Sequence, residues 1–481
     1  MSDSKRAARR IPKNSSTRTA RCSAFQALRT INAGGGYANL VLSELLRDTA
    51  LAARDTAFVT DLVNTTCRLQ GTLDAVIAAA AGRPVNKLES AVRDVLRLGA
   101  AQLWLGVPAH AAVSETVTLA RSAVGARVSG LVNAIMRRIY ERTTAQWLDL
   151  LTAGLDELSA LALRYAHPKW IVEVFAGLVP ASELPALLEA DNTPATPVLA
   201  IRPGLIGRAT LLDSAGGQPT PYSPFGIIRP GNPATLPELR AGLVGVQDEG
   251  SQLVTLAAIR ALRAVTATDT DELTPLVSSA LPAPPVIAPW LDMCAGPGGK
   301  AALLAGLALE WNTRLLASEV QPHRAQLVAQ ALRAYTSHNH LVITADARNA
   351  PWQADTFALT LVDAPCSGLG ALRRRPDARW RRTPESVDEL RALQRALLDS
   401  AIRATAPGGV IAWITCSPHP LETAAIVYEA VADAPLTILD APALLPEVPD
   451  AAAATDPRFV QLWPHRHGTD AMFLALARKG Y

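Results

Sequence analysis

Two cysteines in small, polar surroundings are the residues of this sequence best suited to covalent chemistry. Cys366 stands in the segment 363–368 (Asp-Ala-Pro-Cys-Ser-Gly) and Cys416 in the segment 415–418 (Thr-Cys-Ser-Pro), each just after an apolar run. A lone cysteine is most often a small buried hydrophobe. Two cysteines in matching positions fit that interpretation poorly. Because a thiolate is a strong nucleophile, the pair indicates covalent catalysis.

A glycine-rich turn is the second feature with chemical potential. It follows the apolar run 290–293 and precedes the apolar segment 301–304. Its residues are Cys294, Ala295, Gly296, Pro297, Gly298, Gly299 and Lys300. Glycines let a backbone turn tightly and approach a ligand closely. The spacing matches neither a dinucleotide fingerprint nor a phosphate loop. We predict a cofactor-binding turn, with an ordinary strand-to-helix connection as the alternative.

Three acidic residues, Glu319, Asp346 and Asp363, stand at or just beyond the ends of further apolar runs. A carboxylate after the second strand of a doubly wound sheet commonly binds ribose hydroxyls. A carboxylate after the third strand can accept a hydrogen bond from an adenine amino group. Each acid alone could be a helix cap or a surface charge. Together with the glycine-rich turn they predict a site for a nucleoside cofactor.

A parallel sheet is needed to bring these side chains together. Five apolar runs have the length of strands and are separated mostly by helical segments: 290–293, 315–319, 341–344, 359–363 and 410–414. This alternation predicts a doubly wound α/β sheet with helices on both faces. Ligands of such sheets bind at the carboxyl ends of the strands. We therefore expect both cysteines and the three carboxylates at that edge.

A basic cluster with one tryptophan follows Cys366, and Asp377 is its one acidic residue. Its members are Arg373, Arg374, Arg375, Arg379, Trp380, Arg381 and Arg382. We predict that the arginines bind RNA phosphates and that Trp380 stacks on a base. A solvated charged surface is the alternative.

Paired thiols beside a nucleoside cofactor and an RNA-binding surface point to methylation of cytosine. C5 of cytosine is a poor nucleophile. A thiolate that adds to C6 makes C5 able to take a methyl group from a sulfonium, and a base must then remove the C5 proton so that the thiol can leave. Chemistry alone does not say which cysteine attacks, because DNA cytosine methyltransferases place the nucleophile in a Pro-Cys context, which here is Cys366.

The rest of the chain reads as further domains. Residues 1–20 are basic and are expected to form a disordered tail, with a dedicated RNA-binding arm as the alternative. Residues 21–145 are expected to form an all-helical bundle, and 146–245 linker helices with a small α/β module. Residues 246–481 form the predicted doubly wound domain, in which the Thr-, Asp- and Pro-rich stretch 264–288 is expected to be a flexible loop.

The composition is that of a globular protein. The chain has 481 residues, a net charge of +3 and five cysteines, of which no two have close metal-ligand spacing. No purely apolar stretch reaches the roughly 18 residues needed for a membrane span. We therefore expect a cytoplasmic monomer without disulfides, with no metal and no membrane partner.

These motifs together resemble the cytosine-C5 RNA methyltransferase family, and within it the bacterial small-subunit ribosomal RNA methyltransferase B (Sun/Fmu) group. The resemblance covers nearly the whole chain. Its most specific feature is Asp-Ala-Pro-Cys-Ser-Gly followed by a Thr-Cys-Ser whose cysteine lies 50 positions later. Residues 108–113 and 131–134 are similar to the NusB-like RNA-binding domain, the middle of the chain to the small RNA-binding module of the family, and residues 247–252 to the segment that leads into its methyltransferase core.

The resemblance implies a Rossmann-like class I methyltransferase domain that uses S-adenosyl-L-methionine and acts on 16S ribosomal RNA. It implies that Cys416 is the nucleophile and that Cys366 assists release of the methylated RNA, with Asp363 beside them. Cofactor contacts are implied for the turn 294–300 and for Glu319, Asp346 and Asp363.

Three other functions fit parts of the sequence. A transfer RNA cytosine-C5 methyltransferase would share the core, although the helical domain resembles the ribosomal group. A non-catalytic RNA-binding or ribosome-assembly protein would not need an intact turn and both cysteines. A small-molecule methyltransferase would need neither the additional domains nor the arginine cluster.

Overall fold

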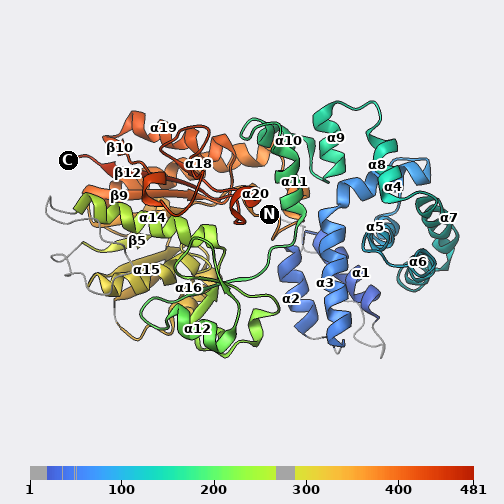
Figure 1. Cartoon of the computed structure of the whole chain (residues 1–481), viewed down its shortest axis with the longest axis horizontal. Coiled ribbons are helices and arrows are strands. Elements are labelled where there is room, and N and C mark those ends of the chain that lie inside the picture. The colour runs from blue at the N-terminus through green and yellow to red at the C-terminus, as the bar shows by residue number, and fades with distance from the viewer. Residues whose placement is uncertain (1–18, 35, 48, 50, 267–287, 338) are drawn as a thin grey trace, which may run out of the picture. The chain divides into compact units, whose positions relative to one another are not determined.

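Figure 1 shows the computed structural model of the chain, which describes residues 19–34, 36–47, 49, 51–266, 288–337 and 339–481. The chain divides into two units, and each is described by itself. The first contains the described residues up to His167 and the segment Arg375–Asp377. The second contains Pro168–Arg374 and Ala378–Tyr481.

Two sequence-based expectations fall almost entirely outside the described residues. They are the basic tail 1–20 and the loop 264–288. A helix lies at the end of the predicted tail and another at the start of the predicted loop. Helix α1 begins at Ala20, and helix α14 continues to Thr266, so the first residues of the predicted loop belong to a helix.

The first unit is all-helical in its described residues, apart from turns and loops, as the sequence predicted. In α5, Val92, Val95 and Leu96 recur at helical spacing and share a buried core with Leu28 and Leu62. Burying such an apolar stripe supplies most of the stability of helices of this length. The helices are α1 (Ala20–Asn32), α2 (Ala38–Arg47), α3 (Ala53–Arg68), α4 (Gln70–Ala81), α5 (Ser90–Trp104), α6 (Ala109–Ala123), α7 (Ser129–Tyr140), α8 (Thr144–Thr152) and α9 (Glu157–Arg164).

Helices α8 and α9 belong to this first unit, so it extends beyond the boundary predicted at residue 145. Two buried or partly buried hydrogen bonds explain why. The Trp147 indole donates to the Ile139 carbonyl at 2.8 Å, and the Thr72 hydroxyl donates to the Leu163 carbonyl at 2.6 Å. These contacts fix both helices to α7 and α4.

A small antiparallel sheet follows helices α10 (Lys169–Ala176) and α11 (Leu184–Asn192) at the start of the second unit. Its strand order is β2-β3-β1-β4. Leu199, Ile227 and Val244 form its core. Its elements are β1 (Val198–Ile201), α12 (Arg208–Ala215), β2 (Gln218–Pro219), β3 (Gly226–Ile228), α13 (Pro237–Ala241) and β4 (Val244–Val246). It is the small α/β module that the sequence predicted in this part of the chain.

The large sheet has the strand order β10-β12-β9-β8-β5-β6-β7. Neighbours from β9 to β7 are parallel, and β12 is antiparallel to β9 and β10. All five predicted strands are present, whereas the sequence analysis missed β10, β11 and β12. The strands are β5 (Trp290–Asp292), β6 (Leu315–Glu319), β7 (His340–Thr344), β8 (Phe357–Asp363), β9 (Thr405–Thr415), β10 (Leu436–Ile438), β12 (Phe473–Lys479) and, beside β12, β11 (Val460–Gln461).

Helices cover both faces of this sheet (Figure 1). One face packs against α14 (Glu249–Thr266), α15 (Gly299–Glu310) and α16 (Pro322–Leu332), the other against α18 (Pro384–Ala404) and α19 (Ala424–Asp433). Along β9, Val410 and Ala412 join the first core while Ile411 and Trp413 join the second. Successive side chains point to opposite faces, so a strand buried on both faces is apolar throughout. No helix within the described ranges is long and apolar enough to cross a membrane.

A buried ion-pair network fixes the loop that follows β8. Arg373 and Arg374 each contact both Asp248 and Asp470, with N–O distances between 2.5 and 3.0 Å. The side chains of Arg373 and of the two aspartates are at most 10% exposed. The network therefore ties this loop to the start of α14 and to the segment that precedes β12.

Replacing Asp248 by alanine is expected to destabilise the second unit. Removing one partner of a buried ion-pair network typically costs about 3–5 kcal/mol, because the remaining charges stay buried. Calorimetry should show the unfolding midpoint of this unit lowered by at least about 5 °C. Asp433→Ala is the matched control, since its ion pair with Arg395 is largely exposed and should contribute little. Equal midpoints for the two variants would contradict this role of Asp248.

Candidate active site

The predicted cofactor turn connects β5 to α15, and two of its glycines have no room for a side chain. A Cβ on Gly296 would lie 2.2 Å from Glu319 Oε2. Gly298 has a φ of +110°, and its Cβ would lie 2.7 Å from the Cβ of Ala331. Glycine is therefore required at Gly298 by its φ and by the close approach of α16, whereas a side chain at Gly296 would displace the carboxylate of Glu319.

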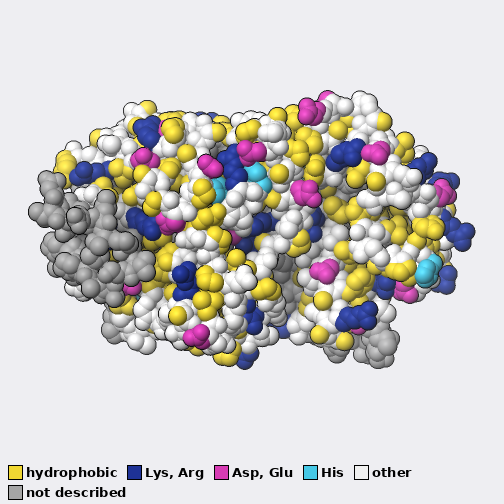
Figure 2. Space-filling model, viewed as in Figure 1, with side chains coloured by type: hydrophobic (Ala, Val, Ile, Leu, Met, Phe, Trp, Pro, Cys, Tyr) yellow, Lys and Arg dark blue, Asp and Glu magenta, His cyan; other side chains and the backbone are white. Residues whose placement is uncertain are grey.

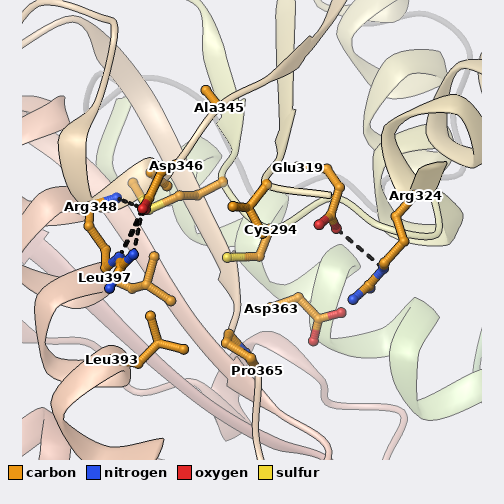
Figure 3. A pocket seen from close by; sticks show the side chains of 13 residues that line it. Cys294, Glu319, Arg324, Ala345, Asp346, Arg348, Asp363, Pro365, Leu393 and Leu397 are labelled. Atoms are coloured by element: carbon orange, nitrogen blue, oxygen red, sulfur yellow. Dashed lines mark hydrogen bonds and ion pairs between the residues drawn. The ribbon is translucent and has the colours of Figure 1, made fainter. Parts of the chain in front are cut away.

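A cavity of about 280 Å³ lies at the carboxyl ends of β5, β6, β7 and β8. Figure 3 shows Cys294 near its middle, with carboxylates of three successive strand ends around it. Four predicted site residues line it: Cys294, Glu319, Asp346 and Asp363. The other lining residues are Met293, Val320, Arg324, Ala345, Ala347, Arg348, Pro365, Leu393 and Leu397. The remaining predicted turn residues, Ala295 to Lys300, do not line it.

Two arginines that the sequence analysis missed pair with the carboxylates of this cavity (Figure 3). Arg324 Nε lies 3.5 Å from Glu319 Oε2, and Arg348 Nη2 lies 2.6 Å from Asp346 Oδ2. The hydrogen bonds from Arg348 lower the pKa of Asp346. Each arginine follows its acid by at most five positions in the sequence. Looking for basic residues just after the strand-end acids would therefore have identified both arginines.

A third carboxylate pairs with a buried lysine. Lys300 Nζ lies 2.8 Å from Asp363 Oδ2, and the lysine side chain is 8% exposed. Burial lowers the pKa of Lys300, but the ion pair with Asp363 and the charge of Cys416 outweigh it and raise the pKa. The ion pair links the cofactor turn to the strand that leads to Cys366.

Asp292, at the end of β5, is a buried acid that sequence reasoning missed. Neither of its carboxyl oxygens has a well-formed hydrogen bond within the described part of the chain. Burial, followed by the negative charge of Asp363, raises its pKa to about 8. It lay hidden inside an apolar run that was predicted to be a strand.

The two cysteines of the sequence prediction lie side by side. Their sulfur atoms are 3.4 Å apart, and both side chains are partly buried. The hydrogen bond with Cys416, and then burial, raise the pKa of the Cys366 thiol. The loop that carries Cys366 is held closely, since Gly370 donates to the Cys416 carbonyl and a Cβ on Gly370 would lie 2.1 Å from the Ala471 carbonyl oxygen. Among the described residues, no group of three or more His, Cys, Asp or Glu side chains could hold a metal ion.

The side chains of the predicted arginine surface do not form one exposed group. Arg379 is fully buried, where its guanidinium donates to Asn192 and to the Asp191 carbonyl, so it cannot bind RNA phosphates in this conformation. Arg373 and Arg374 are held by the buried ion-pair network. These three arginines have structural partners that sequence inspection could not reveal.

The other members of the cluster have different surroundings. Arg375 is exposed and lies over the Tyr37 ring of the first unit, 5.4 Å from its centroid. Arg381 is exposed, Trp380 is partly buried, and Arg382 donates to the Ser367 carbonyl. On the face drawn in Figure 2, basic and acidic side chains are interspersed and do not form a basic strip.

Comparisons with known proteins agree with this architecture. Residues 283–478 match the family described as 16S rRNA methyltransferase RsmB/F, and residues 18–141 match the NusB family. The chain is 30% identical to ribosomal RNA small subunit methyltransferase B of Vibrio cholerae over 439 residues, which cover 89% of this chain and 90% of that protein. The chain belongs to the RsmB/F family of 16S rRNA methyltransferases. It is also 44% identical to the protein Rv1407 of Mycobacterium tuberculosis over 466 residues, 96% of each chain.

Solved structures share the fold of this RsmB/F family member. The crystal structure of PH0851 has a TM-score of 0.75 at 21% identity and covers 97% of this chain, which in turn covers all of that one. NSun6 from Pyrococcus horikoshii, solved with SFG, has a TM-score of 0.52 at 17% identity and covers 65% of this chain and 98% of its own. These likenesses confirm the Rossmann-like fold of the methyltransferase sheet.

Asp292 should make the stability of this RsmB/F methyltransferase depend on pH. Between about pH 4 and about pH 8 the folded state holds the Asp292 proton and the unfolded state does not, so stability falls as pH rises through this window. The variant Asp292→Asn has no proton to lose at this position, so its stability should not show this fall with rising pH. Thermal unfolding is measured at about pH 6 and about pH 8. The unfolding midpoint of the variant, relative to that of the wild type, should be higher at the higher pH.

Asp456→Asn is the control for this measurement. The hydrogen bonds from Arg458, ahead of the opposing effect of burial, lower the Asp456 pKa to about 2, so its contribution does not change over this range. A constant difference between Asp292→Asn and the wild type at the two pH values would show that Asp292 does not titrate there.

Proposed function

We propose that this protein transfers a methyl group from S-adenosyl-L-methionine to C5 of a cytosine in 16S ribosomal RNA through a covalent bond between Cys416 and C6. The observation that carries the proposal is the 3.4 Å separation of two thiols at the same sheet edge as a cavity lined by strand-end carboxylates. Membership of a 16S rRNA methyltransferase family supports the RNA substrate.

The cavity fits a nucleoside cofactor. Its glycine turn lets β6 approach closely, and its apolar wall of Leu393 and Leu397 offers a surface for a planar ring. The solved relative NSun6, which has the same fold, was crystallised with SFG, an analogue of S-adenosylmethionine. When bound, S-adenosylmethionine supplies an electrophilic methyl group. The residues proposed to hold it are the turn Cys294–Lys300 with Glu319, Asp346 and Asp363.

The thiolate of Cys416 would act as the nucleophile. Its sulfur forms a bond to C6 of the cytosine, and the electrons of the C5–C6 double bond move to C5, which becomes able to take the methyl group. Proximity to Lys300 supports this assignment, since the charges of Cys416 and Lys300 interact. A nearby cation favours the thiolate form.

Cys366 would act at the end of the reaction. Once C5 carries the methyl group, a base must remove the C5 proton. The electrons of that bond re-form the C5–C6 double bond, and the bond to Cys416 breaks. The Cys366 sulfur, 3.4 Å from that of Cys416, lies within reach of the same base ring. Its place next to the attacking sulfur supports a role in product release.

A transfer RNA substrate remains the alternative with the same chemistry, and the match of residues 18–141 to the NusB family favours ribosomal RNA. A purely RNA-binding role would leave the paired thiols without a function. Of the predicted RNA-binding residues, Arg375, Trp380, Arg381 and Arg382 stay candidates.

Bisulfite mapping tests the substrate. We expect 16S ribosomal RNA from cells that lack this protein to lose one or a few protected cytosines, and the purified protein with S-adenosylmethionine to restore them. A variant without the thiol, Cys416→Ala, is the matched control and should restore nothing. An unchanged ribosomal map together with altered cytosines in transfer RNA would overturn the ribosomal assignment.

The two cysteines are distinguished by their variants. Cys416→Ala should abolish methyl transfer, because the variant lacks the proposed nucleophile. Cys366→Ala should accumulate a covalent protein–RNA adduct that survives a denaturing gel, because release is blocked after transfer. Cys294→Ala serves as the control for loss of a thiol nearby and should form no adduct. An adduct in Cys416→Ala and none in Cys366→Ala would reverse the proposed roles.

A further inference from the structure

We infer that Glu422 is a positioning residue that holds the Cys366 loop against the Cys416 strand and places its negative charge on the Cys366 side of the thiol pair. This inference rests on the proposed function. The proton shared by the two thiols then resides on Cys366, and Cys416 is the thiol that ionises. Neither the family comparisons nor the sequence motifs assign a role to this residue.

The contacts of Glu422 span the two strand-end loops. Its side chain is fully buried in the turn Pro420–Glu422, and its carbonyl accepts from the indole of Trp413 in β9 at 3.2 Å. Its carboxylate accepts from the backbone N–H of Ser367 at 2.7 Å and from the Ser367 hydroxyl at 2.5 Å. Ser367 directly follows Cys366. Glu422 is thus anchored on the strand that leads to Cys416 and grips the loop that carries Cys366.

Three further hydrogen bonds connect the same two loops. Gln394 of α18 donates to Glu422 Oε1 at 3.1 Å and to the Pro365 carbonyl at 2.9 Å. The hydroxyls of Ser367 and Ser417 lie 3.0 Å apart, and Ser417 directly follows Cys416. Each cysteine is therefore followed by a serine of one network, and Glu422 is the charged member of that network. Buried networks of this kind hold their members in one arrangement.

Charge is distributed unevenly around the two sulfurs. The groups that face Cys366 are Cys416 itself, Glu422, Asp363 with its partner Lys300, and Arg382, which donates to the Ser367 carbonyl at 2.9 Å. The negative groups prevail. The hydrogen bond with Cys416 and burial are the largest causes that raise the pKa of the Cys366 thiol, and the charges of Glu422 and Asp363 raise it further.

Cys416 is influenced by a positive charge. Lys300 interacts with its charge, and a cation beside a thiol favours the thiolate. When two thiols share one proton, small differences in surroundings decide which keeps it. The Glu422 carboxylate is hydrogen-bonded to the residue that follows Cys366, and the charge of Lys300 acts on Cys416. The asymmetry supplies a physical basis for two chemically identical side chains to take different roles.

Site-resolved alkylation tests the inference without RNA or cofactor. The full-length protein is treated with iodoacetamide at a series of pH values, and modification of each cysteine is measured by mass spectrometry. In the wild type, Cys416 should be modified at lower pH than Cys366. In Glu422→Gln, which keeps the size but loses the charge, the Cys366 profile should move to lower pH by about one unit, as expected for removal of a nearby like charge.

Two further variants separate charge from folding. Glu422→Asp keeps the charge on a shorter side chain and should leave the Cys366 profile near that of the wild type. Glu429→Gln changes a carboxylate of α19 that pairs with Arg391 on the surface, and should change neither profile. Should Glu422→Gln unfold, the Glu422→Asp profile still reports whether charge at this position keeps Cys366 protonated, by comparison with Glu422→Ala.

The inference is overturned if Cys366 reacts before Cys416 in the wild type, or if the Glu422→Gln and wild-type profiles of Cys366 coincide. Both outcomes concern the thiols alone. Failure of the bisulfite test with the expected alkylation order would instead overturn the proposed substrate and leave the role of Glu422 standing.

Discussion

The parallel pairing of β8 with β9 is the constraint on which the site depends. Asp363 lies opposite Ile414 in this register, so Cys366 and Cys416 leave the sheet at the same edge and almost the same height. A slip of one residue would turn the side chains of one strand to the other face. The same edge receives the turn after β5, since β5 is the next strand along. One register therefore sets the thiol pair, the Lys300–Asp363 ion pair and the cavity.

Much of this arrangement could be predicted because its strands are buried on both faces and appear as apolar runs. The glycine turn and the acids at strand ends followed from that. Strand β10 was missed because a strand of three residues at the edge of a sheet lacks such a signal. Strand β12 lies between β10 and β9 and begins with a buried apolar run, so its signal was present in the sequence and was overlooked. Asp292 was hidden inside a strand. Glu422 could not be found from local sequence, since its role arises from Ser367 and Gln394, which lie 55 and 28 positions away.

The arginine cluster shows a limit of a different kind. A run of like charges in the sequence suggests a solvent-facing surface. Arg373 is instead hydrogen-bonded to Asp248, 125 positions earlier in the chain, and to Asp470, 97 positions later. Arg379 donates a hydrogen bond to Asn192, which lies 187 positions earlier in the chain. Buried charges must be paired, but pairing at such separations is a property of the tertiary structure. Composition alone cannot distinguish a phosphate-binding arginine from one that holds two loops together.

The ion-pair network around Asp470 also has a consequence for the order of events during synthesis. The loop that carries Cys366 emerges first, and its partners Asp470 and Ala471 follow about 100 positions later. At about 5–20 residues per second, this gap is on the order of 5–20 s. During that time the loop has the counter-charge of Asp248 but lacks that of Asp470 and the backbone hydrogen bond between Ala471 and Gly370. The thiol pair is thus among the last parts of the sheet to be assembled on a growing chain.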